Sequence, residues 1–496
     1  MMGTLLRRNK GARGARIVRD RGGPRSRSRL SEPLIVLLAV LMPILLFGGA
    51  SRADVATHSL VRAVAIAGLA WSVARGGWLY RGSLRAPVLL LAAWLVMVAL
   101  QLMPLPPGLW SSLPGREAFA EVFESIGQGD LWRPLTFSPA ATTNSLFALF
   151  IPLAVLVALA RTDPRHWRTV LLALLAYAAL SAMMGIVQIV SQARWSYFYR
   201  ITTQGAAVGL FANRNHQALL MALSFPLLAL FAAWPSESTQ QRKFAQFVAL
   251  AGAVLLVPLI LITGSRAGLV LMVIGIIGAW LIYRGGMAEK SLHATKHEAR
   301  RSRAGRLGLA PLLLTAGLVA LVGATVILSR AEAVQRLFSQ DVAQEIRVRL
   351  FPVMLDLGNS FAPWGTGFGT FDPLFRMVEP FDNLNPIYVN RAHNDLLEIY
   401  IEGGILALAI AAGFLFWLVR STLRAWRPVR GRARIEVLLA RTGSAVLAMQ
   451  LVGSLADYPL RTPAHAAIAA VAVGMVAAAG RVRAAKVSMD AAGGGV

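Results

Sequence analysis

The chain has 496 residues, of which 56% are hydrophobic and only 15% are charged. These percentages give about 278 apolar residues of 496, more than a soluble domain of this size can bury, whereas one membrane-spanning helix takes up about 20. The composition therefore excludes a soluble enzyme and predicts an all-α polytopic membrane protein with about twelve transmembrane helices. A membrane β-barrel is excluded too, because its strands alternate apolar and polar residues and this sequence has unbroken apolar runs.

The chain is strongly basic, with 50 Lys and Arg against 24 Asp and Glu and a formal net charge of +26. In a soluble protein this excess would indicate nucleic acid, but here it is typical of basic residues that collect in cytoplasmic loops. The first thirty residues hold ten Lys or Arg, one acid and no aromatic side chain on which bases could stack. We therefore expect a disordered cytoplasmic tail that touches anionic membrane lipid, and no nucleic-acid partner. The absence of cysteine excludes disulfides and thiolate chemistry.

Continuous apolar runs predict twelve membrane-spanning helices. They lie at residues 33–50, 58–76, 86–104, 143–160, 168–190, 214–234, 245–262, 267–284, 308–328, 396–419, 437–456 and 463–480. The sequence Ser51-Arg52-Ala53 after the first run resembles a signal-peptide cleavage site. The basic segment before it is too long for a signal peptide, so the first run is expected to be retained as a span.

Loop charge predicts how these helices are oriented. The loops 284–306 and 420–436 hold seven and six basic residues with two and one acids, and both fall on the side of the basic N-terminus. The segments 104–142 and 330–395 fall on the other side and carry more acids than bases. The positive-inside rule therefore predicts that both termini are cytoplasmic and that these two segments lie outside.

The expected organisation follows from the spans. It consists of a cytoplasmic tail at 1–32, spans 1–9 within 33–329, a large outer loop at 330–395, spans 10–12 within 396–480 and a second tail at 481–496. In the outer loop, the apolar spacing of Val342–Leu357 suits a helix that lies on the membrane or caps a cavity. The stretch PWGTGFGTFDPLF that follows predicts an ordered turn region.

Five polar stretches are expected to share the outer face. They are GLFANRNH at 209–216, TGSRAG at 263–268, Arg347-Val348-Arg349, His393-Asn394-Asp395 and DYPLR at 457–461. Arginines near one membrane depth are unfavourable unless something offsets their charge. They could extend to the interface or pair with acids of these stretches, but turn-forming neighbours hold Arg214 and Arg266 in place. Because a guanidinium binds phosphate oxygens in a bidentate fork, these two arginines predict a lipid pyrophosphate site.

His393 is the best candidate for a general base, because an imidazole accepts a proton near neutral pH. Asp395 is only two residues away, so a direct pair with His393 requires a non-helical start of the next helix. Glu398 or Glu402 is expected to be an inward polar residue. The alternative is that His393 caps the helix and bonds a loop carbonyl. His216 is expected to be structural.

Motifs of several other activities are absent from the sequence. It has no Asp-x-Asp pair for a metal-bound nucleotide sugar, no GxxxxGK[ST] loop for ATP and no HExxH zinc motif. The GTGFG stretch follows no predicted strand and lies outside, so we do not expect it to bind a nucleotide. We expect neither a metal nor another cofactor.

Four stretches resemble the O-antigen ligase and polymerase superfamily. They are GLFANRNHQALLMALSFPL, LITGSRAGLVLMVIGI, RVRLFPVMLDLGNSFAPWGTGFGTF and RAHNDLLEIYIEGGILALAI. The last contains a His followed ten residues later by Gly, here His393 and Gly403. The turn Asn213-Arg214-Asn215 departs from the Pro-containing turn of many relatives, which makes the match at Arg214 looser than that at His393.

The resemblance implies a metal-independent, inverting glycosyltransferase at the periplasmic face of the bacterial inner membrane. Its donor would be a glycan on undecaprenyl pyrophosphate, and its acceptor would be lipid A-core or another polysaccharide. By motif match, Arg214 and Arg266 would bind the pyrophosphate and His393 would activate the acceptor hydroxyl. Further substrate-binding residues are expected among Arg347, Arg349, Asn394, Asp395 and Arg461.

A ligase is the first interpretation, because the His-centred loop resembles that branch more closely. An O-antigen or exopolysaccharide polymerase is the alternative within the superfamily. A transporter of lipid-linked sugar would also have twelve spans, but its broken helices would lie in paired positions near the midplane, whereas the unusual residues here gather at one face. A structural scaffold, the third alternative, would not need His393.

Overall fold

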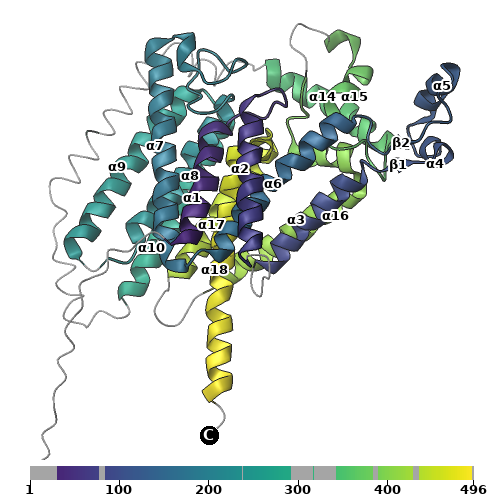
Figure 1. Cartoon of the computed structure of the whole chain (residues 1–496). Coiled ribbons are helices and arrows are strands. Elements are labelled where there is room, and N and C mark those ends of the chain that lie inside the picture. Colours follow the sequence, from purple (N-terminus) through teal and green to yellow (C-terminus); the bar gives the residue numbers. More distant parts are fainter. Residues whose placement is uncertain are drawn as a thin grey trace, which may run out of the picture.

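The computed structural model describes residues 31–76, 84–236, 238–291, 317, 342–383, 389–427 and 435–493. In this part of the chain, long apolar helices form a bundle with one small sheet (Figure 1). Eight helices have the length and composition to span a membrane: α2 (Thr57–Ala74), α6 (Pro139–Arg161), α7 (Trp167–Ser191), α8 (Arg214–Ala233), α9 (Thr239–Thr263), α10 (Arg266–Ser291), α16 (Asp395–Ala425) and α17 (Ile435–Ser454). Shorter apolar segments form α1 (Glu32–Phe47), α3 (Arg85–Leu100) and the first part of α18 (Pro463–Gly493).

These helices confirm an all-α polytopic membrane protein, and eleven of the twelve predicted spans coincide with one of them. The remaining predicted span, 308–328, lies outside the described residues except for residue 317, and most of the N-terminal tail lies outside them too. Among the helix starts, the largest difference from prediction is at α9, which begins at Thr239 and not at residue 245. Its first turns are polar and are capped by Ser238, whose hydroxyl accepts a hydrogen bond from the amide of Gln241 (3.5 Å). Apolar sequence marks where lipid surrounds a helix, and the helix itself extends into the interface.

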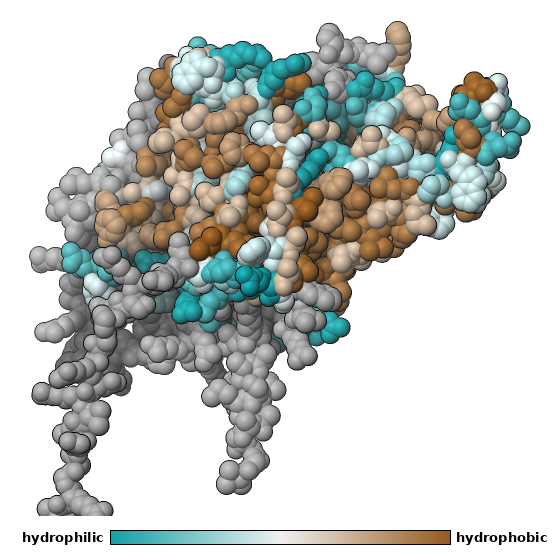
Figure 2. Space-filling model, in the orientation of Figure 1, coloured by the Kyte–Doolittle hydropathy of each residue, from teal (hydrophilic) through white to brown (hydrophobic). Residues whose placement is uncertain are grey.

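The surface of the bundle has the distribution expected in a bilayer. Figure 2 shows a broad apolar band across the helices with hydrophilic residues toward both ends. Large apolar side chains remain exposed on the long helices, among them Phe244 of α9, Trp280 of α10 and Phe416 of α16. Helices that are apolar on their outward faces are typical of membrane spans.

Helix α8 forms the centre of the bundle and packs against α7, α9, α10 and α17. Nearly all of its side chains from His216 to Ala233 are buried. Gly268 and Gly275 of α10 face Ala218 and Ala222 of α8, and a Cβ at either glycine would crowd α8. Small residues at a helix interface let two backbones approach closely, which is the usual packing mode in membranes.

The remaining elements lie at one end of the bundle, at the top and right of Figure 1. They comprise α14 (Val342–Ser360), α15 (Phe371–Val378), strands β1 (Pro104–Leu105) and β2 (Arg133–Pro134), which pair antiparallel, and the helices α4 (Pro107–Ser111) and α5 (Glu117–Ser125). Short 3-10 turns at this end are η2 (Arg194–Ser196), η3 (Phe381–Asn383) and η4 (Pro459–Arg461), and η1 (Pro164–His166) lies at the other end, between α6 and α7. Helix α14 buries Leu350, Met354 and Leu357 against α15 and α16, which confirms the expected amphipathic helix. Each such burial stabilises the fold by roughly 1.5–3 kcal/mol.

The predicted turn region after α14 is present and docks against a bend in α16. At Gly404 the backbone of α16 leaves the helical region (φ 61°, ψ −155°). The amide of Ile405 donates to the carbonyl of Pro363 (2.9 Å), and the amide of Gly367 donates to the carbonyl of Glu402 (2.9 Å). A side chain at Gly404 would collide with Pro363. At the bend, backbone groups of α16 therefore form hydrogen bonds with the turn in place of bonds within the helix.

Candidate active site

Three helices that carry predicted site residues begin at the same end of the bundle, and each has a polar cap. The side chain of Asn213 caps α8, whose first residue is Arg214. The hydroxyl of Ser265 accepts a hydrogen bond from the first turn of α10, whose first residue is Arg266 (3.0 Å). Asn394 accepts bonds from two amides in the first turn of α16 (3.0 and 3.1 Å). Helix N-termini carry a partial positive charge, so this arrangement favours an anion near the two arginines.

A cavity of about 1010 Å³ lies at this end of the bundle, and we call it the arginine cavity. Four of the predicted site residues line it: Arg214, Arg266, His393 and Asn394. They come from three stretches that are far apart in the sequence. The folded chain therefore brings the predicted base and both predicted pyrophosphate-binding arginines to one cavity.

His393 is held by a buried carboxylate that sequence reasoning did not include among the site residues. Its Nδ1 lies 3.2 Å from Oδ1 of Asp457, whose side chain is only 4% exposed. The ring of His393 packs against Tyr458 at a centroid distance of 5.0 Å. His393 has a left-handed backbone (φ 51°), which is the non-helical start that a His–Asp pair requires. The partner is Asp457 and not Asp395.

Asp457 also holds the turn that precedes Arg214. Its Oδ2 accepts hydrogen bonds from the side-chain amides of Asn213 (3.0 Å) and Asn215 (2.8 Å). Asn215 in turn accepts a bond from the hydroxyl of Ser265 (2.8 Å), which caps the helix of Arg266. One buried carboxylate thus connects the histidine with both arginine-bearing turns. The sequence does carry a signal for Asp457. It is an acid in a short segment between two predicted spans, on the same predicted face as His393.

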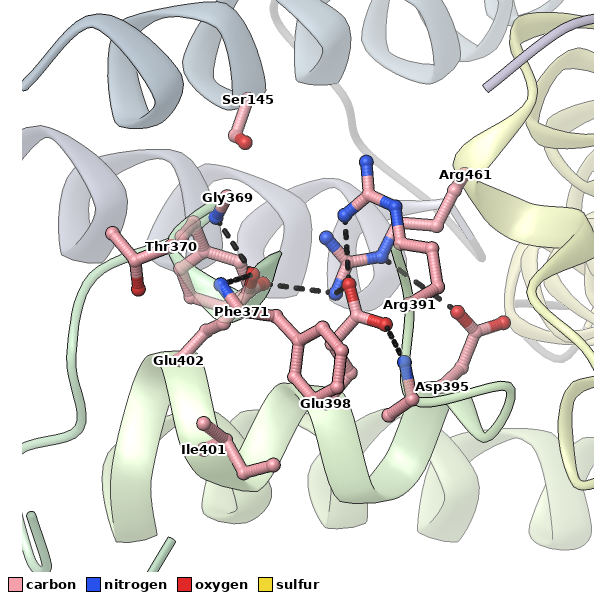
Figure 3. Close-up of polar contacts among 12 residues, drawn as sticks. Ser145, Gly369, Thr370, Phe371, Arg391, Asp395, Glu398, Ile401, Glu402 and Arg461 are labelled. Carbon is pink, nitrogen blue, oxygen red and sulfur yellow. Dashed lines mark hydrogen bonds and ion pairs between the residues drawn. The ribbon is translucent and has the colours of Figure 1, made fainter. Parts of the chain in front are cut away.

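A second polar network lies beside the cavity, centred on Arg461 (Figure 3). Arg461 Nη2 lies 3.0 Å from Oε2 of Glu402 and 3.2 Å from Oε1 of Glu398, and its Nε lies 3.7 Å from Oδ1 of Asp395. Arg391 also pairs with Glu398, at 2.7 Å. Burial acts to lower the pKa of Arg461, but the three carboxylates raise it, and the net pKa lies above its ordinary value. Arg461 therefore remains a cation inside this network.

The second network ties the outer turn to α16. The second oxygen of Glu402 accepts hydrogen bonds from the amides of Gly369 (2.9 Å) and Phe371 (3.2 Å). Glu398 and Glu402 are fully buried, which confirms that α16 carries inward polar residues. The network connects α16, η4 and the turn before α15 through charge-assisted bonds, which are stronger than neutral ones.

The other predicted substrate-binding residues do not line the arginine cavity in the described part of the chain. Asp395 and Arg461 belong to the second network. Arg349 is exposed on α14, and the side chain of Arg347 lies outside the described part of the structure. Substrate roles for these four residues stay predictions. Among the described residues, no group of three or more His, Asp or Glu side chains is placed to hold a metal ion.

Comparison with known proteins identifies a family over part of the chain. Residues 251–412 match the family model described as O-antigen ligase, a family of glycosyltransferase-like enzymes. No curated protein matches the chain. The matched segment contains Arg266, His393 and the docked turn, whereas Arg214 and Asp457, the partner of His393, lie outside the segment. The match shows an O-antigen ligase domain in this segment of the chain.

Proposed function

We propose that the chain is an inverting, metal-independent O-antigen ligase that transfers a glycan from undecaprenyl pyrophosphate to lipid A-core at the periplasmic face of the bacterial inner membrane. The observation that carries the proposal is that His393, held by the buried Asp457, lines one cavity with Arg214 and Arg266. A base and two cations are what a glycosyl transfer with a pyrophosphate leaving group requires.

His393 is the general base in this mechanism. In the tautomer in which Nδ1 donates to Asp457, Nε2 has a free lone pair and accepts the proton of the acceptor hydroxyl. The hydroxyl oxygen attacks the anomeric carbon of the donor from the side opposite the leaving group, so the configuration inverts. The carboxylate of Asp457 then stabilises the imidazolium that forms.

Arg214 and Arg266 stabilise the leaving group. As the bond between the anomeric carbon and the pyrophosphate oxygen breaks, its electron pair moves to the pyrophosphate. Two guanidinium groups at helix N-termini offset this charge by bidentate hydrogen bonds to phosphate oxygens. This division of labour needs no nucleotide, because the activated bond is already present in the lipid-linked donor.

The rim of the arginine cavity supports a donor that stays attached to lipid. Its lining includes exposed apolar side chains from four parts of the chain: Ile201, Val270, Val348, Phe351 and Leu455. Exposed apolar residues beside a polar cavity suit a ligand with a charged head and a hydrocarbon chain. The head would enter the cavity while the polyprenyl chain remains in the bilayer.

The test is transfer by purified protein in nanodiscs with an undecaprenyl pyrophosphate-linked glycan, with chelator present and nucleotide omitted. Lipid A-core and free repeat units are offered as acceptors, and the products are resolved on a gel. His393→Ala should fold, insert and bind donor but lose transfer, because it removes the base. His166→Ala, at the opposite end of the bundle in η1, is the matched control and should retain transfer.

The products separate the candidate functions. A glycan-bearing lipid A-core band supports the ligase. A ladder on the carrier lipid would instead establish a polymerase. If neither acceptor yields product while wild type and His393→Ala bind donor equally, the proposal is overturned in favour of transport or a scaffold.

A further inference from the structure

The loop between α1 and α2 forms part of the wall of the arginine cavity and contributes a third arginine, Arg52. This loop is fixed by its backbone. The amide of Gly49 donates to the hydroxyl of Tyr199 (2.8 Å), and its carbonyl accepts from the amide of Ala212 (3.1 Å). A side chain at Gly49 would collide with the carbonyl of Leu210. The loop of Arg52 is thus joined directly to the turn that leads into α8 and Arg214.

The guanidinium of Arg52 is held on the cavity wall by Asp54. Arg52 Nε lies 3.0 Å from Oδ1 of Asp54, and Nη2 lies 3.2 Å from Oδ2, which is a bidentate arrangement. These hydrogen bonds from Arg52 hold the pKa of Asp54 below its ordinary value, so the carboxylate is charged at neutral pH. The side chain of Asp54 is 64% exposed, and that of Arg52 is 28% exposed. A pair this exposed contributes little to stability, so stability does not explain why the arginine faces a cavity.

We infer that Arg52 is a third binding residue for the anionic head of the donor, and that Asp54 is the partner of its guanidinium in the absence of donor, with which the donor phosphate competes. The inference rests on the proposed function and deepens it, because it assigns a further contact to the same site. Arg52 lies outside the segment that matches the O-antigen ligase family model. A guanidinium offers five donors, so Arg52 reaches a phosphate oxygen while it keeps part of its bond to Asp54. The contacts between the Arg52 loop and the turn before α8 place Arg52 on the same side of the cavity as Arg214.

The test compares binding of undecaprenyl pyrophosphate and undecaprenol to the full-length protein in nanodiscs. The ratio of the two affinities reports recognition of the pyrophosphate alone, since the two probes share the polyprenyl chain. Arg52→Ala should lower this ratio about tenfold, the effect of one lost charge-assisted contact. Asp54→Ala breaks the same ion pair but keeps the guanidinium, so it should bind the pyrophosphate at least as tightly as wild type.

The matched control is Arg376→Ala, which removes another bidentate Arg–Asp pair. Arg376 pairs with Asp372 on α15 at 2.7 and 3.0 Å and does not line the cavity, so its variant should keep the wild-type ratio. An unchanged ratio in Arg52→Ala overturns the inference. So does an equal loss in Asp54→Ala, which would assign the pair a structural role. If Arg52→Ala changes the KM for the acceptor but not the binding ratio, Arg52 contacts the acceptor, which also overturns the inference. If wild type itself does not prefer the pyrophosphate, the proposed donor site fails instead.

Discussion

Asp457, the partner of His393, has the clearest testable role of a single side chain. Asp457→Asn keeps the size of the side chain but removes the charge that stabilises a protonated His393. It also lets an amide donate to Nδ1, which would fix the wrong tautomer. We expect the transfer rate to fall by roughly 10²–10⁴-fold while donor affinity stays within about twofold. Rates in nanodiscs and a donor titration measure the two effects.

The control for this variant is Asp372→Asn, which changes a half-buried acid of the same outer region. It should transfer at the wild-type rate. If Asp457→Asn also retains the wild-type rate, the histidine does not depend on the carboxylate, and the mechanism proposed for His393 fails.

Arg266 separates the effect of charge from that of geometry. Arg266→Ala should weaken donor binding by about 10–100-fold, since hydrogen bonds to charged groups contribute roughly 1.5–3 kcal/mol. Arg266→Lys keeps the charge but loses the bidentate fork, so it should restore only part of the affinity. Binding of undecaprenyl pyrophosphate measures both. Arg165→Ala, which removes an exposed arginine at the other end of the bundle, should have no effect. Full affinity in Arg266→Ala would remove this residue from the site.

Which residues share the cavity was only partly predictable from the sequence. Arg214, Arg266 and His393 were accessible because each stands beside a turn or cap at the predicted outer face. The partner of His393 was not, because nothing in a single sequence tells which of several acids on one face comes within hydrogen-bond distance. Sequence proximity favoured Asp395, but the helix turns it toward Arg461. Asp457 is 64 residues away along the chain and meets His393 only through helix packing.

The element that positions the outer turn is α16, and Arg461 is its main ionic contact. Arg461→Ala would leave Glu402 buried without its cationic partner and Glu398 with Arg391 alone, a change that costs about 3–5 kcal/mol. We therefore expect a large drop in thermal stability, with donor affinity of the folded protein unchanged. Arg376→Ala, which breaks an exposed pair, should change stability by at most about 1 kcal/mol. Weakened donor binding at wild-type stability would instead support the substrate role predicted for Arg461.

Helices were easier to predict than their ends and their docking. The length of the apolar runs alone located eleven of the helices, because a helix that crosses the bilayer must be apolar over the thickness of the hydrocarbon core. The bend of α16 was not predicted, since Gly403 and Gly404 lie within an otherwise continuous apolar run. The bend depends on bonds to Pro363 and Gly367, which are distant in sequence. A turn-rich stretch predicts that a turn forms, but not the helix on which it docks.

At the scale of the whole molecule, the arginine cavity shows which helices run in the same direction across the bundle. Helices α8, α10 and α16 all begin at the cavity. The chain must therefore return toward that end after α10, and the sequence prediction of a span at 308–328 meets this requirement. Loop charge adds the absolute direction, because the basic loops are expected in the cytoplasm and the cavity on the opposite side.

The absence of cysteine makes this orientation directly measurable, since a single introduced cysteine is the only labelling site. Asp130 is exposed in the segment between α5 and β2, and Asp163 is exposed between α6 and α7, at the other end of the bundle. With the cavity facing outward, Asp130→Cys should react with a membrane-impermeant maleimide in intact spheroplasts. Asp163→Cys should react only after the membrane is permeabilised. The cysteine-free chain is the blank, and transfer activity of both variants confirms folding. The reverse labelling pattern would place the cavity in the cytoplasm and exclude a periplasmic transferase.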